Sequence, residues 1–245
     1  MSIFLVGGGW SSGGDPEVTA PFLAEAAQRA AGSGRMIPRI GFLLVRDGDD
    51  PSDAYRSGYP ASFMAVAACE PVVALITTAP GHEAVFDSAV LNDIDGLVIG
   101  GGMTPAYLAA VEPIMEEIRL LVADGLPYLG FSAGAMIAAD RAVIGGYLID
   151  GVQVCPEDTA EDLDEVTVVE GLGLVDLAID VHAAQWGTLT RLVAATEAGL
   201  VDGGIAIDEF TVLIVGDDSL RVVGTGSVWQ VNQHDDGVLV STLGA

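Results

Sequence analysis

Short runs of apolar residues recur through the first half of the chain, each about as long as a buried strand. They lie at residues 3–6, 40–45, 71–76, 96–99 and 126–130. Between them the pattern changes to helical spacing: Asp15 and Pro16 open an alanine-rich stretch up to about residue 31, and apolar residues recur every three or four positions over 112–123. Continuous apolar strands that alternate with helices predict a mostly parallel sheet covered on both faces.

The second half of the chain has a different pattern. Residues 155–170 form an acidic connection, and residues 187–198 have helical spacing. Five closely spaced apolar runs follow, which predict short strands and hairpins at 204–207, 211–215, 221–223, 228–231 and 238–241. We therefore predict an α/β fold: a three-layer sandwich with a mostly parallel central sheet, helices on both faces and C-terminal antiparallel strands. No internal repeat or linker interrupts it, so we expect residues 1–245 to form a single domain.

Composition excludes several classes of protein. With 245 residues, 51% of them hydrophobic, the chain can build one large core and is not disordered. The apolar runs are too short for a bilayer span, and the N-terminus lacks the basic flank of a secretory signal. Two cysteines, Cys69 and Cys155, match neither a disulfide framework nor a zinc site. We expect a reduced, cytoplasmic protein that needs no metal and no cofactor and contacts no membrane.

The charge balance narrows the range of partners. The chain has 35 acidic residues against nine basic ones and a net charge of −26, which disfavours nucleic acid. The excess of acid either attracts cationic substrates or only keeps the surface soluble. All nine basic residues are arginines, so the chain has no lysine and cannot use a Schiff-base or Ser–Lys mechanism. The sequence leaves a homodimer open.

One segment has the pattern of a nucleophile elbow. Gly130-Phe131-Ser132-Ala133-Gly134 matches G-x-S-x-G, and it lies after a predicted strand and before a helix of small residues. The chemistry needs this spacing because the sharp turn strains the serine backbone, and flanking glycines let neighbouring backbone pass closely. The alternative is an ordinary tight turn that happens to contain a serine.

A glycine-rich loop ends the strand that precedes the elbow strand. The segment from Gly100 through Gly102, Met103 and Thr104 allows backbone N–H groups to approach a ligand. We predict that the N–H groups of Gly102 and Ala133 form an oxyanion hole, against the alternative of a flexible turn. A second glycine run, at residues 7–9, lacks the third glycine of a dinucleotide-binding fingerprint, which excludes NAD.

A nucleophilic serine needs a base, and the chain has three histidines. His82 lies where the sequence suggests the beginning of a helix, and His234 lies in a polar turn between predicted strands. His182 follows a short apolar run and precedes a helix, which places it at the sheet edge where the elbow should lie. We therefore predict His182 as the base rather than a structural histidine.

Three acids are candidates for orienting the base. Asp180 is close to His182 in sequence, while Asp208 and Glu209 follow a predicted strand. Adjacent residues on an extended chain point to opposite sides, so Asp208 and Glu209 cannot both face the imidazole. The residues alone leave the choice open.

The order serine, histidine, acid differs from the Ser-acid-His order of α/β-hydrolases. The motifs resemble the cyanophycinase and aspartyl dipeptidase (peptidase E) family of serine peptidases, which has the class I glutamine-amidotransferase-like fold. Residues 130–135 resemble the family's G-x-S-A-G-A motif, and residues 100–104 resemble its G-G-G-N-T loop. Residues 171–182 together with Arg191 resemble its G-L-G-L…D-x-H pattern and closing R-L, and residues 205–211 resemble its G-I-D-E-x-T motif. The resemblance implies Ser132 as nucleophile, His182 as base and Glu209 as the third member, with Asp208 turned away.

The sequence also departs from that family. Met103 replaces an asparagine of the glycine loop, and both arginines of the Gln-Arg-x-Arg cluster that follows the histidine are replaced, although Gln185 is kept. We predict Met103, Thr104, Gln185, Trp186 and Arg191 as substrate-binding residues. Arg191 is the one cation near the motifs, so we expect weak activity on aspartyl dipeptides and cyanophycin and a preference for neutral or cationic side chains.

The leading hypothesis is a serine peptidase that hydrolyses short peptides through an acyl-enzyme. One alternative is a member of the same fold that has lost catalysis and binds a small molecule. Another is an amidase or esterase that uses the same triad.

Overall fold

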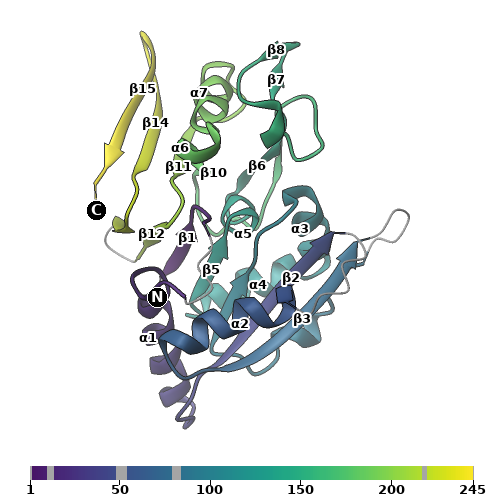
Figure 1. The fold of residues 1–245 in the computed structure, drawn as a ribbon, viewed down its shortest axis with the longest axis vertical. Helices are drawn as coiled ribbons and strands as arrows, with labels where there is room; N and C mark the ends of the chain where they lie inside the picture. The colour runs from purple at the N-terminus through teal and green to yellow at the C-terminus, as the bar shows by residue number, and fades with distance from the viewer. Residues whose placement is uncertain (1, 10–13, 48–53, 79–83, 217–219, 245) are drawn as a thin grey trace.

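A seven-stranded sheet forms the centre of the molecule in the computed structural model, which describes residues 2–9, 14–47, 54–78, 84–216 and 220–244. The strand order is β13-β12-β1-β5-β4-β2-β3 (Figure 1). The five strands from the first half of the chain pair in parallel, and β12 pairs antiparallel with β1 and β13, so the predicted mostly parallel sheet is confirmed. The strands are β1 (Ile3–Val6), β2 (Arg39–Asp47), β3 (Glu70–Thr78), β4 (Gly96–Ile99), β5 (Tyr128–Phe131), β12 (Thr211–Val215) and β13 (Leu220–Gly224).

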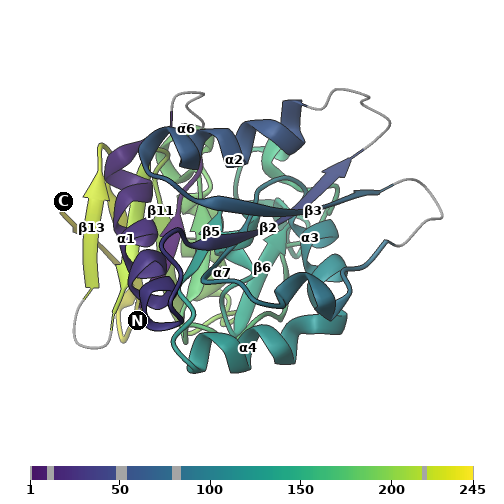
Figure 2. The same ribbon diagram turned by 90° about the horizontal axis from the view of Figure 1, so that it is seen from below.

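Helices cover both faces of this sheet, as predicted, and Figure 2 shows α2 and α4 on opposite sides of the strands. Strand residues alternate between the two faces: Phe4 and Val6 belong to one buried cluster, while Ile3 and Leu5 belong to the other. The helices are α1 (Pro16–Gly32), α2 (Ala54–Val66), α3 (Thr104–Val111), α4 (Met115–Ala123) and α5 (Ala133–Met136), with the short 3-10 turns η1 (Ser88–Leu91), η2 (Glu112–Ile114) and η3 (Glu157–Thr159).

Two helix features show where sequence patterns succeed and fail. Helix α1 begins as predicted, because the Asp15 carboxylate accepts a hydrogen bond from the N–H of Glu17 at 3.0 Å and a proline occupies the first turn. The helix expected over 112–123 instead begins as the 3-10 turn η2 before α4 continues it. Helix α2, which contains Pro60, has no counterpart in the predicted elements.

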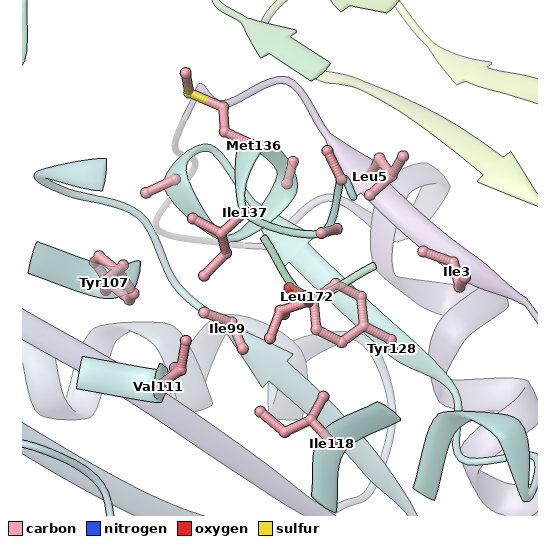
Figure 3. Packing of buried hydrophobic residues seen from close by; sticks show 14 of the residues in the cluster. Ile3, Leu5, Ile99, Tyr107, Val111, Ile118, Tyr128, Met136, Ile137 and Leu172 are labelled. Atoms are coloured by element: carbon pink, nitrogen blue, oxygen red, sulfur yellow. The ribbon is translucent and has the colours of Figure 1, made fainter. Parts of the chain in front are cut away.

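The layer beneath α5 is tightly packed around the strand that leads into the elbow. Figure 3 shows Ile99, Tyr128, Ile137 and Leu172 side by side in this cluster. The Tyr128 hydroxyl is fully buried and donates a hydrogen bond to the Gly134 carbonyl at 2.6 Å, so its polar group is satisfied. The elbow therefore sits on a rigid base.

The C-terminal half adds a second sheet, in the order β10-β11-β14-β15 (Figure 1). The predicted antiparallel strands are present, but they divide between the two sheets: β12 and β13 extend the central sheet, and β14 and β15 form a hairpin on β11. The remaining elements are β6 (Arg141–Gly145), β7 (Leu148–Ile149), β8 (Val152–Gln153), β9 (Thr167–Glu170), β10 (Ala178–Val181), α6 (Ala183–Trp186), α7 (Leu189–Glu197), β11 (Gly203–Ile207), β14 (Val228–His234) and β15 (Gly237–Leu243). Among the residues described, no helix has both the length and the apolar character needed to cross a bilayer.

Candidate active site

Ser132 occupies the junction between β5 and α5, in the backbone conformation that the elbow motif predicts. Its φ of 52° and ψ of −110° lie in a region that non-glycine residues rarely adopt. A Cβ atom at Gly130 would lie 2.3 Å from the Gly134 carbonyl oxygen, and one at Gly134 would lie 2.3 Å from that of Ile99. The flanking glycines therefore let three backbone segments meet where the serine is exposed to the cleft.

His182 approaches Ser132 from the other sheet. Its Nε2 lies 2.9 Å from the Ser132 Oγ, within hydrogen-bonding distance, as predicted. The residue follows the carboxyl end of β10 in a left-handed conformation with φ 55°, and its N–H donates to the Gly7 carbonyl at 2.9 Å. The site thus forms where the carboxyl ends of β1 and β5 meet the carboxyl end of β10.

Of the three acids considered, Glu209 is the one that contacts the imidazole. Its Oε1 lies 2.7 Å from His182 Nδ1. Asp208 points away, and its carboxylate accepts hydrogen bonds from Trp229 Nε1 and from the N–H groups of Ala184 and Ser227. The alternation expected for adjacent residues is therefore observed, and Asp208 ties the loop to its surroundings.

The surroundings of His182 favour the neutral imidazole. Burial lowers the pKa of His182, and the hydrogen bond and charge of Glu209 oppose that shift without cancelling it. With Nδ1–H donating to Glu209, Nε2 is left as an acceptor for the serine proton. The arrangement suits a general base that works at neutral pH.

A pH profile should show this lowered pKa. We expect kcat/KM to rise with pH as His182 loses its proton, with a midpoint below the 6.5 of an unperturbed imidazole. Glu209→Gln removes the charge that raises the pKa, so the midpoint should fall further while the plateau drops roughly 10²- to 10⁴-fold. A midpoint above 6.5 in the wild type, or a profile unchanged in Glu209→Gln, would contradict this assignment of the base.

Two backbone N–H groups beside the serine are available to an oxyanion. Neighbouring amides are used elsewhere: Gly101 N–H donates to the Tyr59 hydroxyl at 3.1 Å, and Gly134 N–H donates to the Gly100 carbonyl at 3.0 Å. Within the described part of the chain, the N–H groups of Gly102 and Ala133 have no such acceptor. They are the pair that the sequence predicts for the oxyanion hole, and that role stays a prediction.

A cleft of about 760 Å³ opens in front of Ser132. Met103 and Trp186 line it, and their role in substrate binding stays a prediction. The Trp186 indole also stacks on the His182 imidazole, with ring centres 3.7 Å apart and planes within 6°. Much of the remaining lining is acidic and is called the acidic wall below: it includes Glu157, Asp158, Glu161, Asp162 and Asp164.

The structure corrects the expectation for Arg191. The guanidinium is buried, with 2% of the side chain exposed, and it binds both carboxylate oxygens of Asp180 at 2.7 and 2.8 Å. It also donates to the Thr159 carbonyl at 2.7 Å. Its contacts with the described residues are inside the protein, and Asp180 supplies the acid partner that a buried arginine requires. The guanidinium is therefore not available to a substrate carboxylate.

Thr104 and Gln185 are also used internally. Thr104 is fully buried, and both its N–H and its hydroxyl donate to Glu161 rather than facing the cleft. Gln185 is exposed, and its Oε1 accepts a hydrogen bond from the Glu209 N–H at 2.9 Å. Thr104 therefore does not bind substrate directly, which corrects that expectation, and Gln185 contacts the backbone of the residue that orients the histidine.

The other two histidines are not near the serine in the structure as described. His234 lies at the exposed turn between β14 and β15, and His82 falls outside the described residues. In the ranges that the structure describes, no three His, Cys, Asp or Glu side chains gather as a metal site would require.

The glycine run at residues 7–9 is a part of the site that the sequence reasoning missed. A Cβ atom at Gly8 would lie 2.1 Å from the Cε1 of His182, and one at Gly9 would lie 2.9 Å from the Cβ of Glu209. The backbone of this run thus packs directly against the histidine and its acid. The available signal was three glycines at the carboxyl end of a strand, which can mark a close approach of any kind, not only to a phosphate.

Comparisons with known proteins identify relatives of this chain. The sequence profile described as Peptidase family S51 matches residues 59–223. A cyanophycinase from Synechococcus elongatus is 31% identical over 152 residues, which are 60% of this chain and 44% of that protein. Peptidase E from Nostoc sp. is 23% identical over 161 residues, 60% of each chain. This chain therefore matches less than half of the length of the curated cyanophycinases.

Solved structures share the fold. The crystal structure of a peptidase from an acI-B1 Actinobacterium aligns with a TM-score of 0.60 at 17% identity, covering 100% of this chain and 95% of that one. A putative peptidase E from Listeria monocytogenes aligns with a TM-score of 0.53 at 15% identity, covering 92% of this chain and 98% of that one. At such identities the likeness concerns the fold alone.

Proposed function

This chain belongs to peptidase family S51, and on that premise we propose that it is a serine peptidase that hydrolyses short peptides through an acyl-enzyme on Ser132, His182 and Glu209. One observation carries the proposal: the continuous chain of contacts from Ser132 Oγ to His182 Nε2 at 2.9 Å and from His182 Nδ1 to Glu209 Oε1 at 2.7 Å. A fold that had lost catalysis would have no reason to keep the serine strained and this chain of contacts intact.

The acylation step follows from the hydrogen bonds. Ser132 Oγ attacks the scissile carbonyl while His182 Nε2 takes the hydroxyl proton, and Glu209 stabilises the imidazolium that results. The negative charge that develops on the carbonyl oxygen is met by the N–H groups of Gly102 and Ala133. His182 then gives its proton to the leaving amine, and the acyl group stays on Ser132 as an ester.

Deacylation reverses the roles. A water molecule attacks the ester carbonyl, His182 accepts a proton from that water, and the same N–H groups hold the second oxyanion. Collapse of this intermediate returns the proton to Ser132 Oγ and releases the acid product. Apart from the substrate and the attacking water, every group in both steps belongs to the chain, and none of the steps requires lysine, which the sequence lacks.

Charge in the cleft supports a preference among substrates. Four exposed carboxylates line it, from Glu157, Asp158, Asp162 and Asp164, while the described lining contains no arginine. A substrate carboxylate would meet repulsion there, since Arg191 is occupied by Asp180. The proposed substrates are therefore peptides with neutral or cationic side chains, and aspartyl dipeptides and cyanophycin should be poor ones.

A dipeptide panel tests both the activity and the preference. We expect kcat/KM to be highest for lysyl and arginyl peptides, intermediate for alanyl peptides and lowest for α- and β-linked aspartyl peptides, with Ser132→Ala as the blank. The double variant Asp158→Asn, Asp164→Asn should lose about threefold to tenfold on cationic peptides, because exposed charges contribute up to about 1 kcal/mol each, and should leave alanyl peptides unchanged. A clear preference for N-terminal aspartate would contradict the substrate assignment. Turnover of aryl esters or amides with no peptide hydrolysis would point to an esterase or amidase.

A further inference from the structure

A carboxylate from the acidic wall holds the glycine loop beside Ser132. Glu161 Oε2 accepts a hydrogen bond from the Thr104 N–H at 2.9 Å, and its Oε1 accepts one from the Thr104 hydroxyl at 3.2 Å. The two residues are 57 positions apart, with Thr104 at the start of α3 and Glu161 in the loop after η3. Thr104 opens helix α3 and directly follows Gly102 and Met103. The contact therefore ties the cleft wall to the loop that carries one proposed oxyanion donor.

The surroundings of Glu161 show that this contact is built into the fold. Glu161 and Asp162 adopt left-handed backbone conformations, with φ of 58° and 59°, which cost free energy for residues other than glycine. Burial raises the pKa of Glu161, while the hydrogen bonds from Thr104 and the charge of Arg191 oppose that rise. Such strain and burial persist only where the structure around the residue fixes it.

Arg191 also holds the segment that contains Glu161, through the carbonyl of Thr159. Arg191 donates to the Thr159 carbonyl at 2.7 Å while its other nitrogens bind Asp180, two residues before His182. A Cβ atom at Gly145 would lie 2.6 Å from the Cβ of Glu161, so the backbone of Gly145 packs closely against this segment. The acidic segment, residues 157–165, is thus held at two points. Arg191 links it through Thr159 to Asp180, and Glu161 links it to Thr104 of the glycine loop.

We propose that Glu161 is a positioning residue for the reaction: by binding Thr104 it fixes the Gly102 N–H at the place where the substrate oxyanion develops. The proposal rests on the proposed function. Thr104 is fully buried, and its N–H and hydroxyl both donate to Glu161, while Met136 Sδ is a second, weaker acceptor 3.6 Å from the hydroxyl. Loss of the carboxylate therefore leaves the buried Thr104 N–H without its acceptor and frees the loop to relax. A displaced oxyanion donor weakens binding of the transition state more than binding of the substrate.

The test compares four variants on the best peptide of the panel. Glu161→Ala removes both acceptors, Glu161→Gln keeps an oxygen that can accept from the Thr104 N–H, and Thr104→Val removes only the hydroxyl. Glu165→Gln is the matched control, because Glu165 lies on the same acidic segment, is exposed, and its carboxylate accepts a hydrogen bond from the Gly151 N–H at 3.2 Å. For each we measure kcat, KM, the pH profile and the melting temperature.

We expect Glu161→Ala to lower kcat roughly 10- to 100-fold with KM changed less than about threefold, since an oxyanion donor acts in the transition state. Glu161→Gln should recover most of that loss, Thr104→Val should lose only a few-fold, and Glu165→Gln should match the wild type. The acid limb of the pH profile should stay in place in every variant, because the contacts of His182 are untouched. If Glu161→Ala does not fold, the kcat values of Glu161→Gln and Thr104→Val, each compared with that of the Glu165→Gln control, decide the test.

Other outcomes would overturn the inference. They are a wild-type kcat in Glu161→Ala, a change in KM alone, or a shifted acid limb that shows disturbance of His182 instead. Failure of the proposed function looks different: the wild type itself would then show no hydrolysis that depends on Ser132.

Discussion

Ser132→Ala should lower kcat on any peptide substrate by about 10⁴- to 10⁶-fold, the range seen when the nucleophile of a serine peptidase is removed. The physical reason is that the Oγ atom, 2.9 Å from His182 Nε2, forms the covalent bond to the substrate, and alanine has no atom that can do so. The residual rate would come from the oxyanion donors and from binding alone. Initial rates at saturating substrate measure the effect.

The stability of that variant separates chemistry from folding. Alanine at this position has the same backbone strain as serine, and within the described residues the side-chain hydrogen bond lost is that from Ser132 Oγ to His182. We expect the free energy of unfolding to change by about 1 kcal/mol or less. Retention of more than about a hundredth of wild-type activity by a folded Ser132→Ala protein would show that another group carries the reaction.

Gly8→Ala should lower kcat/KM by about 10²-fold or more, although residue 8 makes no contact with substrate in the proposed mechanism. The added Cβ would lie 2.1 Å from His182 Cε1, so the imidazole must move away from Ser132 or from Glu209. A displacement of about 1 Å from the reactive geometry is enough for a loss of this size. Steady-state kinetics of the purified variant give the number.

Gly34→Ala is the matched control for that change. Gly34 also has a positive φ, +80° against +102° for Gly8, so alanine is strained at both positions. A Cβ atom at Gly34 would meet nothing within 4 Å. We expect Gly34→Ala to lose about 1 kcal/mol of stability and none of its activity. Equal loss of activity in the two variants would show that backbone strain, and not contact with His182, is responsible.

Much of the fold could be predicted because its signals are local. Continuous apolar runs placed the five parallel strands within a few residues, and Asp15 with Pro16 placed the start of α1. Helix α2 was missed because Pro60 interrupts its pattern, although a proline can be accommodated within a helix that tertiary contacts support. The division of the later strands between two sheets depends on long-range pairing, which local patterns do not encode.

The candidate site likewise has parts that the local sequence predicts and parts that depend on contacts between distant residues. The elbow at Ser132 follows from local spacing, and the resemblance to a known family pointed to Glu209 where the residues alone left three acids open. The partners of Arg191 could not be predicted, because its role depends on Asp180 and Thr159, which lie 11 and 32 residues away in sequence and meet it only in the folded chain. The same holds for Gly8 against His182 and for Glu161 against Thr104.

Covalent labelling with a fluorophosphonate tests the central claim most directly, because the probe reacts with a serine only where a base and an oxyanion site activate it. Intact-protein mass spectrometry followed by peptide mapping should show one adduct on the wild type, located on Ser132, and none on Ser132→Ala or His182→Ala. An unlabelled wild type that is folded, or an adduct on any residue other than Ser132, would contradict the account and favour a protein that binds a small molecule without catalysis.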